Sequence, residues 1–141
     1  MFGTGRPALA VVVALCAALG VTGQVAAQAT SQVQFERGTS GATISGAVIG
    51  DEYIDYKLGA KGGQEMRVAM KVVASNGGGN AYFNILPPHS SGEAIYNSSI
   101  DGDSTAVRLP ADGEYTIRVY QMGADADEGK TTGFEIDVSI K

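Results

Sequence analysis

The sequence predicts an all-β protein, a single β-sandwich of about eight antiparallel strands, and two observations carry that prediction. Apolar residues recur at every second position along much of the chain, as in Tyr115, Ile117 and Val119. This is the period of a strand that turns one face toward a core. The alternating segments are short, glycine-rich turns separate them, and no long stretch has helical periodicity. Such a pattern is typical of a sandwich or a barrel.

Each strand is predicted from its own alternation and from the turn that ends it. Glycines mark the turns at 50–52 and 61–63, and Asp101-Gly102-Asp103 marks a later one. Three consecutive glycines within 75–80 cannot hold a strand and predict an exposed loop, whereas Pro87 and Pro88 end the strand that precedes them. The expected strands are 44–49, 54–58, 66–72, 81–86, 94–96, 105–109, 114–120 and 134–141.

The last two strands are expected to form a hairpin around an acidic loop, residues 122–130. Because Ile117 and Val119 turn inward, Arg118 and Tyr120 face the other way. Functional residues concentrate on polar loops that a rigid scaffold holds. This loop is therefore the first candidate for a functional site.

Residues 1–29 have the form of a secretory signal peptide. Arg6 precedes the apolar run 8–21, and Ala27-Gln28-Ala29 supplies the small-x-small pattern that a signal peptidase accepts. A retained membrane anchor is less favoured, because the run is shorter than the roughly 20 apolar residues that span a bilayer. We expect cleavage after Ala29, a mature domain at 30–141 in the periplasm or outside the cell, and no membrane attachment afterwards.

The charge and cysteine content of the expected mature domain exclude several functions. Its only cysteine, Cys16, would leave with the signal, which excludes disulfides, thiol nucleophiles and thiolate zinc sites. Removing Arg6 leaves 9 of the 10 basic residues and all 15 acidic ones, a net charge of −6 with histidine neutral. This charge disfavours nucleic acid and anionic lipid, and it favours a cationic partner.

No grouping of residues points to catalysis or to a cofactor. His89, the single histidine, follows two prolines in a polar loop, and no Gly-x-Ser-x-Gly sequence accompanies it. The loop carboxylates lie among glycines and charges, whereas a glycosidase needs one carboxyl in an apolar pocket. Residues 101–104 and 125–128 group oxygen donors, but neither fits the calcium loop that ends in a glutamate. We expect a protein that is not an enzyme.

Outward-facing aromatic residues are better candidates for a binding surface. Tyr53, Tyr82 and Tyr120 fall on the side of their strands that faces away from the core, and Arg118 shares the face of Tyr120. Tyrosine and arginine dominate the binding energy of many protein interfaces.

A family resemblance rests on the order and spacing of motifs across nearly the whole mature domain. They are Val33-Gln34-Phe35-Glu36-Arg37-Gly38, Ser45-Gly46, Gly50, Tyr53, Tyr56, Ala60-Lys61-Gly62-Gly63-Gln64, Leu109-Pro110-Ala111, Tyr115, Arg118-Val119 and Gln121. Together these motifs resemble the periplasmic inhibitors of goose-type (g-type) lysozyme. The glycine-glutamine and Leu-Pro-Ala turns are also similar to those of the bacterial pre-peptidase C-terminal (PPC) domains. The resemblance implies a jelly-roll or PPC-like sandwich.

The resemblance also implies a function, in which a loop enters the active-site cleft of the lysozyme and occludes it without chemistry. The final loop, Met122–Lys130, would be that element. In the family this loop typically carries arginines that can pair with carboxylates in the cleft, whereas the matching positions here hold Gly123 and Asp127, with Glu128 alongside. A carboxylate brought against a catalytic carboxylate is repelled, which can cost an interface several kcal/mol.

Three alternatives stay open: inhibition through other residues, a different cationic envelope protein as target, or a fold that has lost the function. The leading hypothesis is inhibition of g-type lysozyme by a monomer or homodimer. Arg118 would be its polar anchor and Tyr53 and Tyr120 its apolar contacts, while Asp125 and Asp127 would set specificity. The rival hypothesis is a PPC-like accessory module that binds cell-envelope carbohydrate or calcium.

Overall fold

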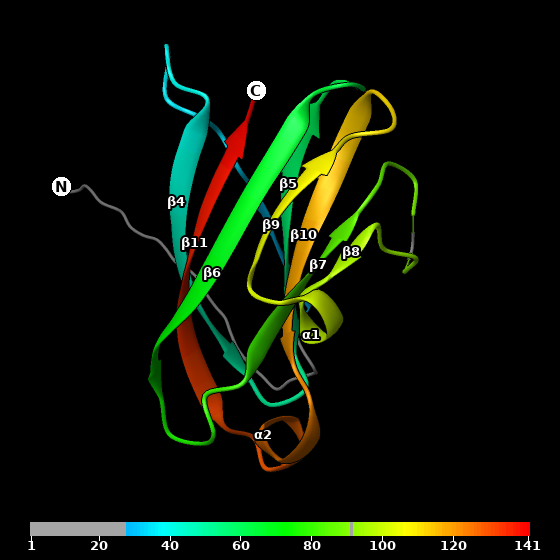
Figure 1. Ribbon diagram of the computed structural model, residues 1–141. Helices are drawn as coiled ribbons and strands as arrows, with labels where there is room; N and C mark the ends of the chain where they lie inside the picture. Colours follow the sequence, from blue (N-terminus) through cyan, green and yellow to red (C-terminus); the bar gives the residue numbers. More distant parts are fainter. Residues whose placement is uncertain (1–27, 91) are drawn as a thin grey trace, which may run out of the picture.

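A computed structural model describes residues 28–90 and 92–141, and in it two β-sheets pack face to face around one core (Figure 1). The first sheet, in spatial order, consists of β3 (Gln28–Gln32), β5 (Tyr53–Ala60), β10 (Gly113–Gln121), β7 (Ala81–Leu86) and β8 (Tyr96–Asn97). The second consists of β4 (Gly41–Ile49), β11 (Thr131–Ile140), β6 (Glu65–Ser75) and β9 (Ser104–Arg108). Two short helices, α1 (Ser98–Asp101) and α2 (Gly123–Asp127), lie in the connections.

The all-β sandwich predicted from the alternation is confirmed, and most strands lie within two or three residues of their expected bounds. The structure departs from the prediction at β8, which overlaps the expected strand only at Tyr96. It also departs at β3, which pairs with β5 in parallel, with Thr30 opposite Asp55. The sequence pattern did not predict the two short helices, because four or five residues are too few to show a helical period.

The expected hairpin of the last two strands is wrong. β10 pairs with β5 and β7 in the five-stranded sheet, whereas β11 pairs with β4 and β6 in the four-stranded sheet. The connection that holds α2 therefore crosses from one sheet to the other (Figure 1). Alternation correctly predicts that Ile117 and Ile136 face the core. It does not show whether their strands are neighbours in one sheet or lie in two sheets that face each other, because the inward residues alternate in both cases.

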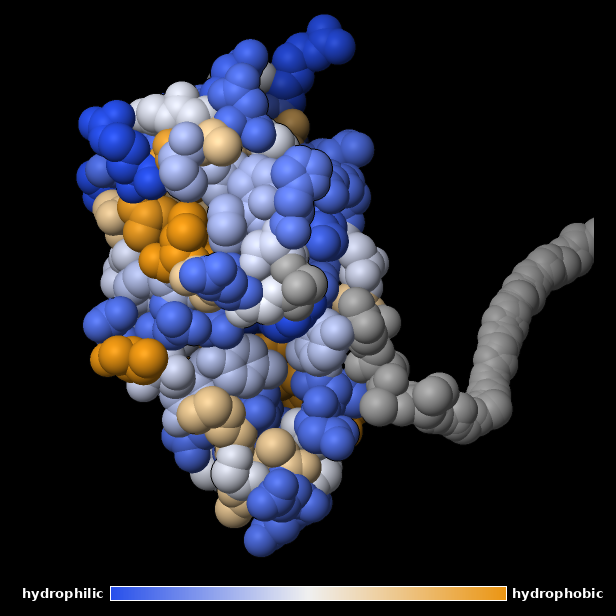
Figure 2. All heavy atoms as spheres, turned by 90° about the vertical axis from the view of Figure 1, so that its right-hand side faces the viewer, coloured by the Kyte–Doolittle hydropathy of each residue, from blue (hydrophilic) through white to orange (hydrophobic). Residues whose placement is uncertain are grey.

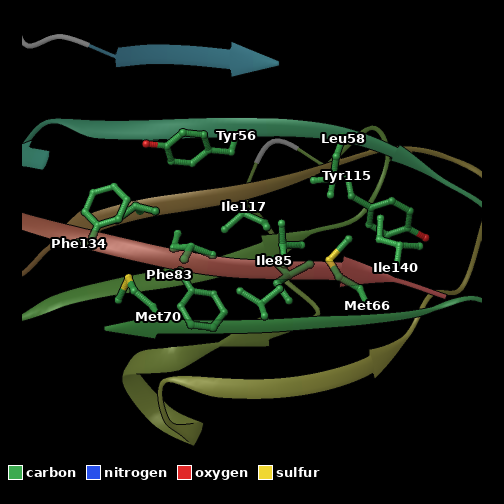
Figure 3. Packing of buried hydrophobic residues seen from close by; sticks show 14 of the residues in the cluster. Tyr56, Leu58, Met66, Met70, Phe83, Ile85, Tyr115, Ile117, Phe134 and Ile140 are labelled. Atoms are coloured by element: carbon green, nitrogen blue, oxygen red, sulfur yellow. The ribbon is translucent and has the colours of Figure 1, made fainter. Parts of the chain in front are cut away.

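The core fills the space between the sheets with side chains from alternate positions (Figure 3). Phe83 and Ile117 of one sheet and Phe134 and Met66 of the other are almost completely buried. Tyr56 and Phe134 meet edge to face across the sandwich, with ring centroids 6.3 Å apart. This contact fits the preferred geometry of aromatic pairs.

On the side that lies to the right in Figure 1, the described residues form no large apolar area (Figure 2). There hydrophilic residues predominate, and hydrophobic residues form small separate patches (Figure 2). Such scattered apolar groups are normal on a protein surface. Within the described residues, no helix is long and apolar enough to cross a membrane. The expected signal peptide lies outside the described residues, apart from Gln28 and Ala29, which begin β3.

Candidate partner-binding surface

A row of three tyrosines crosses the outer face of the five-stranded sheet. The strand register places Tyr120 of β10 between Tyr53 of β5 and Tyr82 of β7. The rings of Tyr82 and Tyr120 lie 6.0 Å apart and are tilted by 40°. All three side chains are half-buried, so each presents part of its ring to solvent. We call these residues the tyrosine row.

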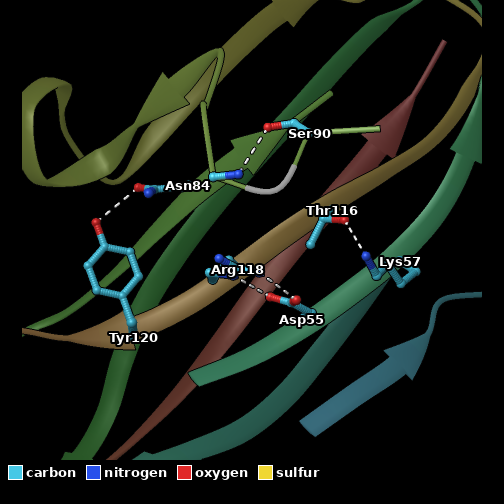
Figure 4. A network of polar contacts seen from close by, with 8 residues as sticks. Asp55, Lys57, Asn84, Ser90, Thr116, Arg118 and Tyr120 are labelled. Carbon is cyan, nitrogen blue, oxygen red and sulfur yellow. Dashed lines mark hydrogen bonds and ion pairs between the residues drawn. The ribbon is translucent and has the colours of Figure 1, made fainter. Parts of the chain in front are cut away.

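The next row along the strands is polar and supports the tyrosines (Figure 4). Arg118 donates two hydrogen bonds to the carboxylate of Asp55, from Nε at 2.7 Å and from Nη2 at 2.9 Å. Its guanidinium carbon lies 4.2 Å from the centre of the Tyr53 ring, a cation–π distance. The hydroxyl of Tyr120 donates to Asn84 Oδ1 at 2.9 Å.

Arg118 forms an ion pair within the protein, and its partner is Asp55. The carboxylate is buried, with 3% of its side chain exposed, whereas 23% of the Arg118 side chain is exposed. The hydrogen bonds to Asp55 raise the pKa of Arg118 above its ordinary value. The expected polar anchor therefore has an internal partner, and its guanidinium holds the ring of Tyr53 in place.

The second part of the candidate surface is the connection between β10 and β11, residues 122–130, which holds α2. Asp125 of α2 anchors this connection to the loop that follows β6. Asp125 is only 6% exposed. Its Oδ1 accepts a hydrogen bond from the N–H of Gly78 at 2.8 Å, and its Oδ2 accepts one from the N–H of Asn80 at 3.1 Å. These backbone hydrogen bonds lower the pKa of Asp125, because they favour its charged form.

The loop between β6 and β7, residues 76–80, contains three consecutive glycines and leaves room for this carboxylate. We call it the glycine loop. A Cβ atom at Gly77 would lie 2.5 Å from Asp125 Oδ1 and 2.7 Å from Lys130 Cγ, so a side chain has no room there. The sequence indicated an exposed loop at these glycines but gave no sign of its partner. Asp125 and Gly78 are 47 positions apart, and only the fold brings them together.

Gln121 anchors both ends of the same connection. Its side chain is buried, and Nε2 donates to the backbone oxygen of Lys130 at 2.8 Å and to that of Gly50 at 3.3 Å. Thr132 Oγ1 donates to Gln121 Oε1 at 2.6 Å. Because Gln121 precedes the connection and Thr132 follows it, these bonds hold its two ends together.

A depression of about 530 Å³ lies between the glycine loop and α2, within the size range of small ligand sites. Tyr82, Met122, Gly123 and Glu128 are among the residues that line it. Tyr82 belongs both to this depression and to the tyrosine row, so the two parts form one continuous area. We call this area the partner surface.

Acidic side chains border the partner surface at the end of the sandwich that carries α2. Asp127 and Glu128 are exposed there. The turn that follows β4 lies beside them, because Gly50 donates to the backbone oxygen of Lys130 at 2.8 Å. That turn adds Asp51. These three acidic residues, the acidic tip, give this end of the molecule a negative charge.

The other candidate residues of the sequence are not brought together. In the part of the chain that the structure describes, no three histidine, cysteine or carboxylate side chains gather as a metal site would require. His89 is exposed in the loop that follows β7, with a positive φ of 67°. A sandwich with a partly exposed aromatic row beside an acidic tip has the features of a protein that binds a partner through its surface.

Comparison with known proteins identifies the family. No family model matches the chain. The curated inhibitor of g-type lysozyme of Escherichia coli (strain K12) is 34% identical over 128 residues, which cover 90% of this chain and 92% of that protein. The crystal structure of the periplasmic inhibitor of g-type lysozyme from Aeromonas hydrophila is 38% identical, with a TM-score of 0.72, and the match covers 81% of this chain and 97% of that one.

The chain therefore belongs to the family of g-type lysozyme inhibitors. A pre-peptidase C-terminal domain of a Bacillus anthracis collagenase shares the fold alone, at 13% identity and a TM-score of 0.50 over 85% of this chain and all of that one. The family, the PPC-like sandwich, the absence of enzymatic function and the periplasmic location predicted from the sequence are confirmed. The roles assigned to Tyr53, Arg118, Tyr120, Gly123, Asp125 and Asp127 stay predictions.

Proposed function

We propose that this protein inhibits g-type lysozyme in the periplasm by binding the enzyme through the partner surface and covering its cleft. The observation that carries the proposal is membership of the inhibitor family over nine-tenths of the chain. Inhibition then requires no chemistry from the inhibitor, only a surface that stays in place on the enzyme.

The tyrosine row supplies the apolar contacts of this surface. Tyr53 and Tyr120 offer large rings whose few rotatable bonds cost little entropy to fix on binding. Arg118 acts through Tyr53, because Asp55 orients its guanidinium below the ring. Residues of these types are the usual centres of binding energy in interfaces.

The α2 connection supplies a preformed shape. Asp125 and Gln121 hold the connection before any partner arrives, so binding does not have to order a loop, and affinity gains from this preorganisation. Gly123 lines the depression without a side chain, and no atom lies within 4 Å of the place where its Cβ would be, which gives room for a group of the enzyme.

The acidic tip determines which part of the enzyme the surface can approach. Asp127 and Glu128 would be repelled by the catalytic carboxylates of a glycosidase, and like charges can cost an interface several kcal/mol. The same residues attract basic side chains. We infer that the acidic tip contacts basic groups at the rim of the cleft, and that it selects lysozymes that carry them.

The muramidase activity of a purified g-type lysozyme, measured with increasing amounts of this protein, tests the function. A chicken-type lysozyme serves as the comparison enzyme, and both are assayed at low and moderate salt. We expect saturable inhibition of the g-type enzyme alone. Full activity of the g-type enzyme at saturating protein would refute the proposal.

Variants then test the surface. Tyr120→Ala is expected to raise the inhibition constant at least roughly 30-fold, equivalent to a hot-spot loss of about 2 kcal/mol. Lys71→Ala, on the exposed outer face of the four-stranded sheet, is the control and should inhibit like the wild type. Thermal unfolding confirms that both variants are folded.

A matched charge pair tests the acidic tip. Glu128→Lys should weaken inhibition, whereas Glu114→Lys should not, because Glu114 is exposed at the start of β10, the opposite end of that strand from the α2 connection. Equal inhibition by the two lysine variants would remove the acidic tip from the contact.

A further inference from the structure

Exposed apolar side chains gather at the end of the sandwich that carries α2, the α2 end (Figure 1). Four of the six large hydrophobic residues that are exposed in the described part of the chain lie there: Ile49, Val72, Val73 and Met122. The turn after β4 meets the α2 connection, where the N–H of Gly50 donates to the backbone oxygen of Lys130 at 2.8 Å. Apolar side chains that are grouped in this way indicate an interaction surface, whereas single ones do not.

A β-bulge in β6 places two neighbouring side chains on the outer face of the four-stranded sheet. Gly133 of β11 pairs with Ala74 of β6. The next residue, Phe134, pairs with Val72, which leaves Val73 as the extra residue of the bulge. A Cβ atom at Gly133 would meet Val73 Cγ2 at 3.6 Å and Ala74 Cβ at 3.8 Å, so both side chains lie beside this glycine. Bulges can re-aim a side chain toward a functional surface in this way.

The bulge and the end of β4 together form an apolar area that we call the bulge patch. Its members, none of them charged, are Ala47, Ile49, Val73, Ala74 and Gly133. Ala47 of β4 pairs with Gly133, and Ile49 follows on the same face of the strand. Ile49 is 47% exposed and Val73 is 54% exposed. The patch therefore offers its largest side chains to solvent.

Polar groups surround the bulge patch, as they surround the apolar centre of many protein interfaces. A shallow hollow of about 360 Å³ extends from the patch to Ser75, Asn76 and Thr131. On the side away from α2, the patch ends at the ion pair of Lys71 and Glu135, whose Nζ and Oε1 lie 3.5 Å apart. This pair lies outside the proposed contact, so Lys71→Ala remains a neutral control.

The charges beside the patch favour a basic partner. Asp51 lies two positions after Ile49, and the α2 connection brings Asp127 and Glu128 to the same end of the molecule. A second copy of this chain, with its net charge of −5, would bring further negative charge against these residues. A protein surface that combines apolar and basic side chains complements both the patch and the acidic tip.

We propose that the bulge patch is a second contact for g-type lysozyme, on the other side of the acidic tip from the partner surface. This inference rests on the proposed function. The partner surface lies on the five-stranded sheet and the bulge patch on the four-stranded sheet, so the α2 end has an apolar area on each side. A cleft has two walls, and an end with two apolar sides can contact both of them.

Ile49→Ser tests the contact, with Ile95→Ser as the matched control. The two isoleucines are 47% and 37% exposed. Ile95 lies far from the α2 end of β7, because its N–H donates to Ile85, whereas Ala81 at the other end of β7 pairs with Gln121. Ile49→Ser should raise the inhibition constant for a g-type lysozyme at least roughly fivefold, and Ile95→Ser should leave it unchanged. Thermal unfolding confirms that both variants are folded.

A fluorescent label reports the contact directly. The described residues contain no cysteine, so Val73→Cys gives the protein purified without its signal peptide one thiol for an environment-sensitive dye. The dye should respond to g-type lysozyme in a saturable way, over the same concentrations that produce inhibition. A dye at Ile95→Cys should not respond.

The outcomes separate this inference from the proposed function. If the wild type inhibits, the second contact is overturned by an unchanged inhibition constant for Ile49→Ser, or by a dye at position 73 that bound enzyme does not affect. A dye signal that rises with the concentration of this protein alone would assign the patch to a second copy and also overturn it. A wild type without inhibition would refute the proposed function itself, and the second contact with it.

Discussion

At the scale of single residues, the buried carboxylates of Asp55 and Asp125 hold the partner surface in shape. Neither is exposed enough to contact a partner itself. Asp55 orients Arg118 below the ring of Tyr53, and Asp125 binds the glycine loop to the α2 connection. Both are almost completely buried. A buried charge is tolerated only when hydrogen bonds replace the water it loses, and in both places they do.

The Asp55–Arg118 pair should respond asymmetrically to mutation. Arg118→Ala is expected to lower the free energy of unfolding by about 3–5 kcal/mol, because it leaves the buried carboxylate without its partner. Asp55→Asn should cost less, since the Arg118 side chain is 23% exposed and can turn its charge toward water. Urea unfolding of the two variants and the wild type measures the difference. A larger loss for Asp55→Asn would contradict this account.

Asp125 should make stability depend on acid pH. Its pKa in the folded protein is lowered, below the value of about 3.9 expected in the unfolded chain. Its contribution is therefore complete above about pH 4 and is lost as the pH falls through the folded pKa. Asp125→Asn should lower the melting temperature at neutral pH, and the difference from wild type should shrink below pH 4. Asp127→Asn is the exposed control, and a pH-independent difference for Asp125→Asn would argue against this role.

At the scale of secondary-structure elements, β4 depends on a glycine to fit the sandwich. A Cβ atom at Gly46 would lie 2.5 Å from Tyr56 Oη and 2.9 Å from Phe134 Cζ. Removing the side chain at this position lets the two rings of the core meet edge to face. β4 is also the end strand of the four-stranded sheet, so within that sheet it pairs with β11 alone.

Gly46→Ala is expected to lower the free energy of unfolding by about 1–3 kcal/mol through overpacking. Gly133→Ala on the neighbouring strand is the matched control, because its added Cβ would meet Val73 at 3.6 Å, an ordinary contact. That change should be neutral or stabilise by up to about 1 kcal/mol. Urea unfolding at low protein concentration compares the two, and equal effects would show that the tight contact is absent.

At the scale of the whole molecule, the excess of acidic residues favours encounters with a cationic enzyme. The net charge of the full chain is −5, and the acidic tip concentrates part of it beside the partner surface. Long-range attraction of this kind raises association rates and is screened by salt.

The association rate with a basic g-type lysozyme should therefore fall as salt rises from about 0.01 to 0.15 M, over which the Debye length shrinks from roughly 30 to 8 Å. Glu128→Lys should lower the rate at low salt and reduce its salt dependence, whereas the dissociation rate should respond more to Tyr120→Ala. Surface plasmon resonance over a salt series separates the two rates. An association rate that salt leaves unchanged would exclude electrostatic steering.

The sequence by itself determined which residues face the core, where the turns fall and what net charge the chain carries. These properties follow from local rules, since a strand alternates its side chains whatever its neighbours are. It also carried the motifs that placed the chain in its family, and it put Tyr53, Arg118 and Tyr120 on the outer face.

Only the tertiary structure decided which strands pair and what each outward side chain contacts. It separated β10 from β11, joined Arg118 to Asp55 across 63 positions of the chain, and buried Asp125 against Gly78 and Asn80, 47 and 45 positions away. It also placed β4 at an open edge. The physical reason is that pairing and register depend on contacts between distant segments, while the period of two that reveals a strand is the same for every partner and either edge.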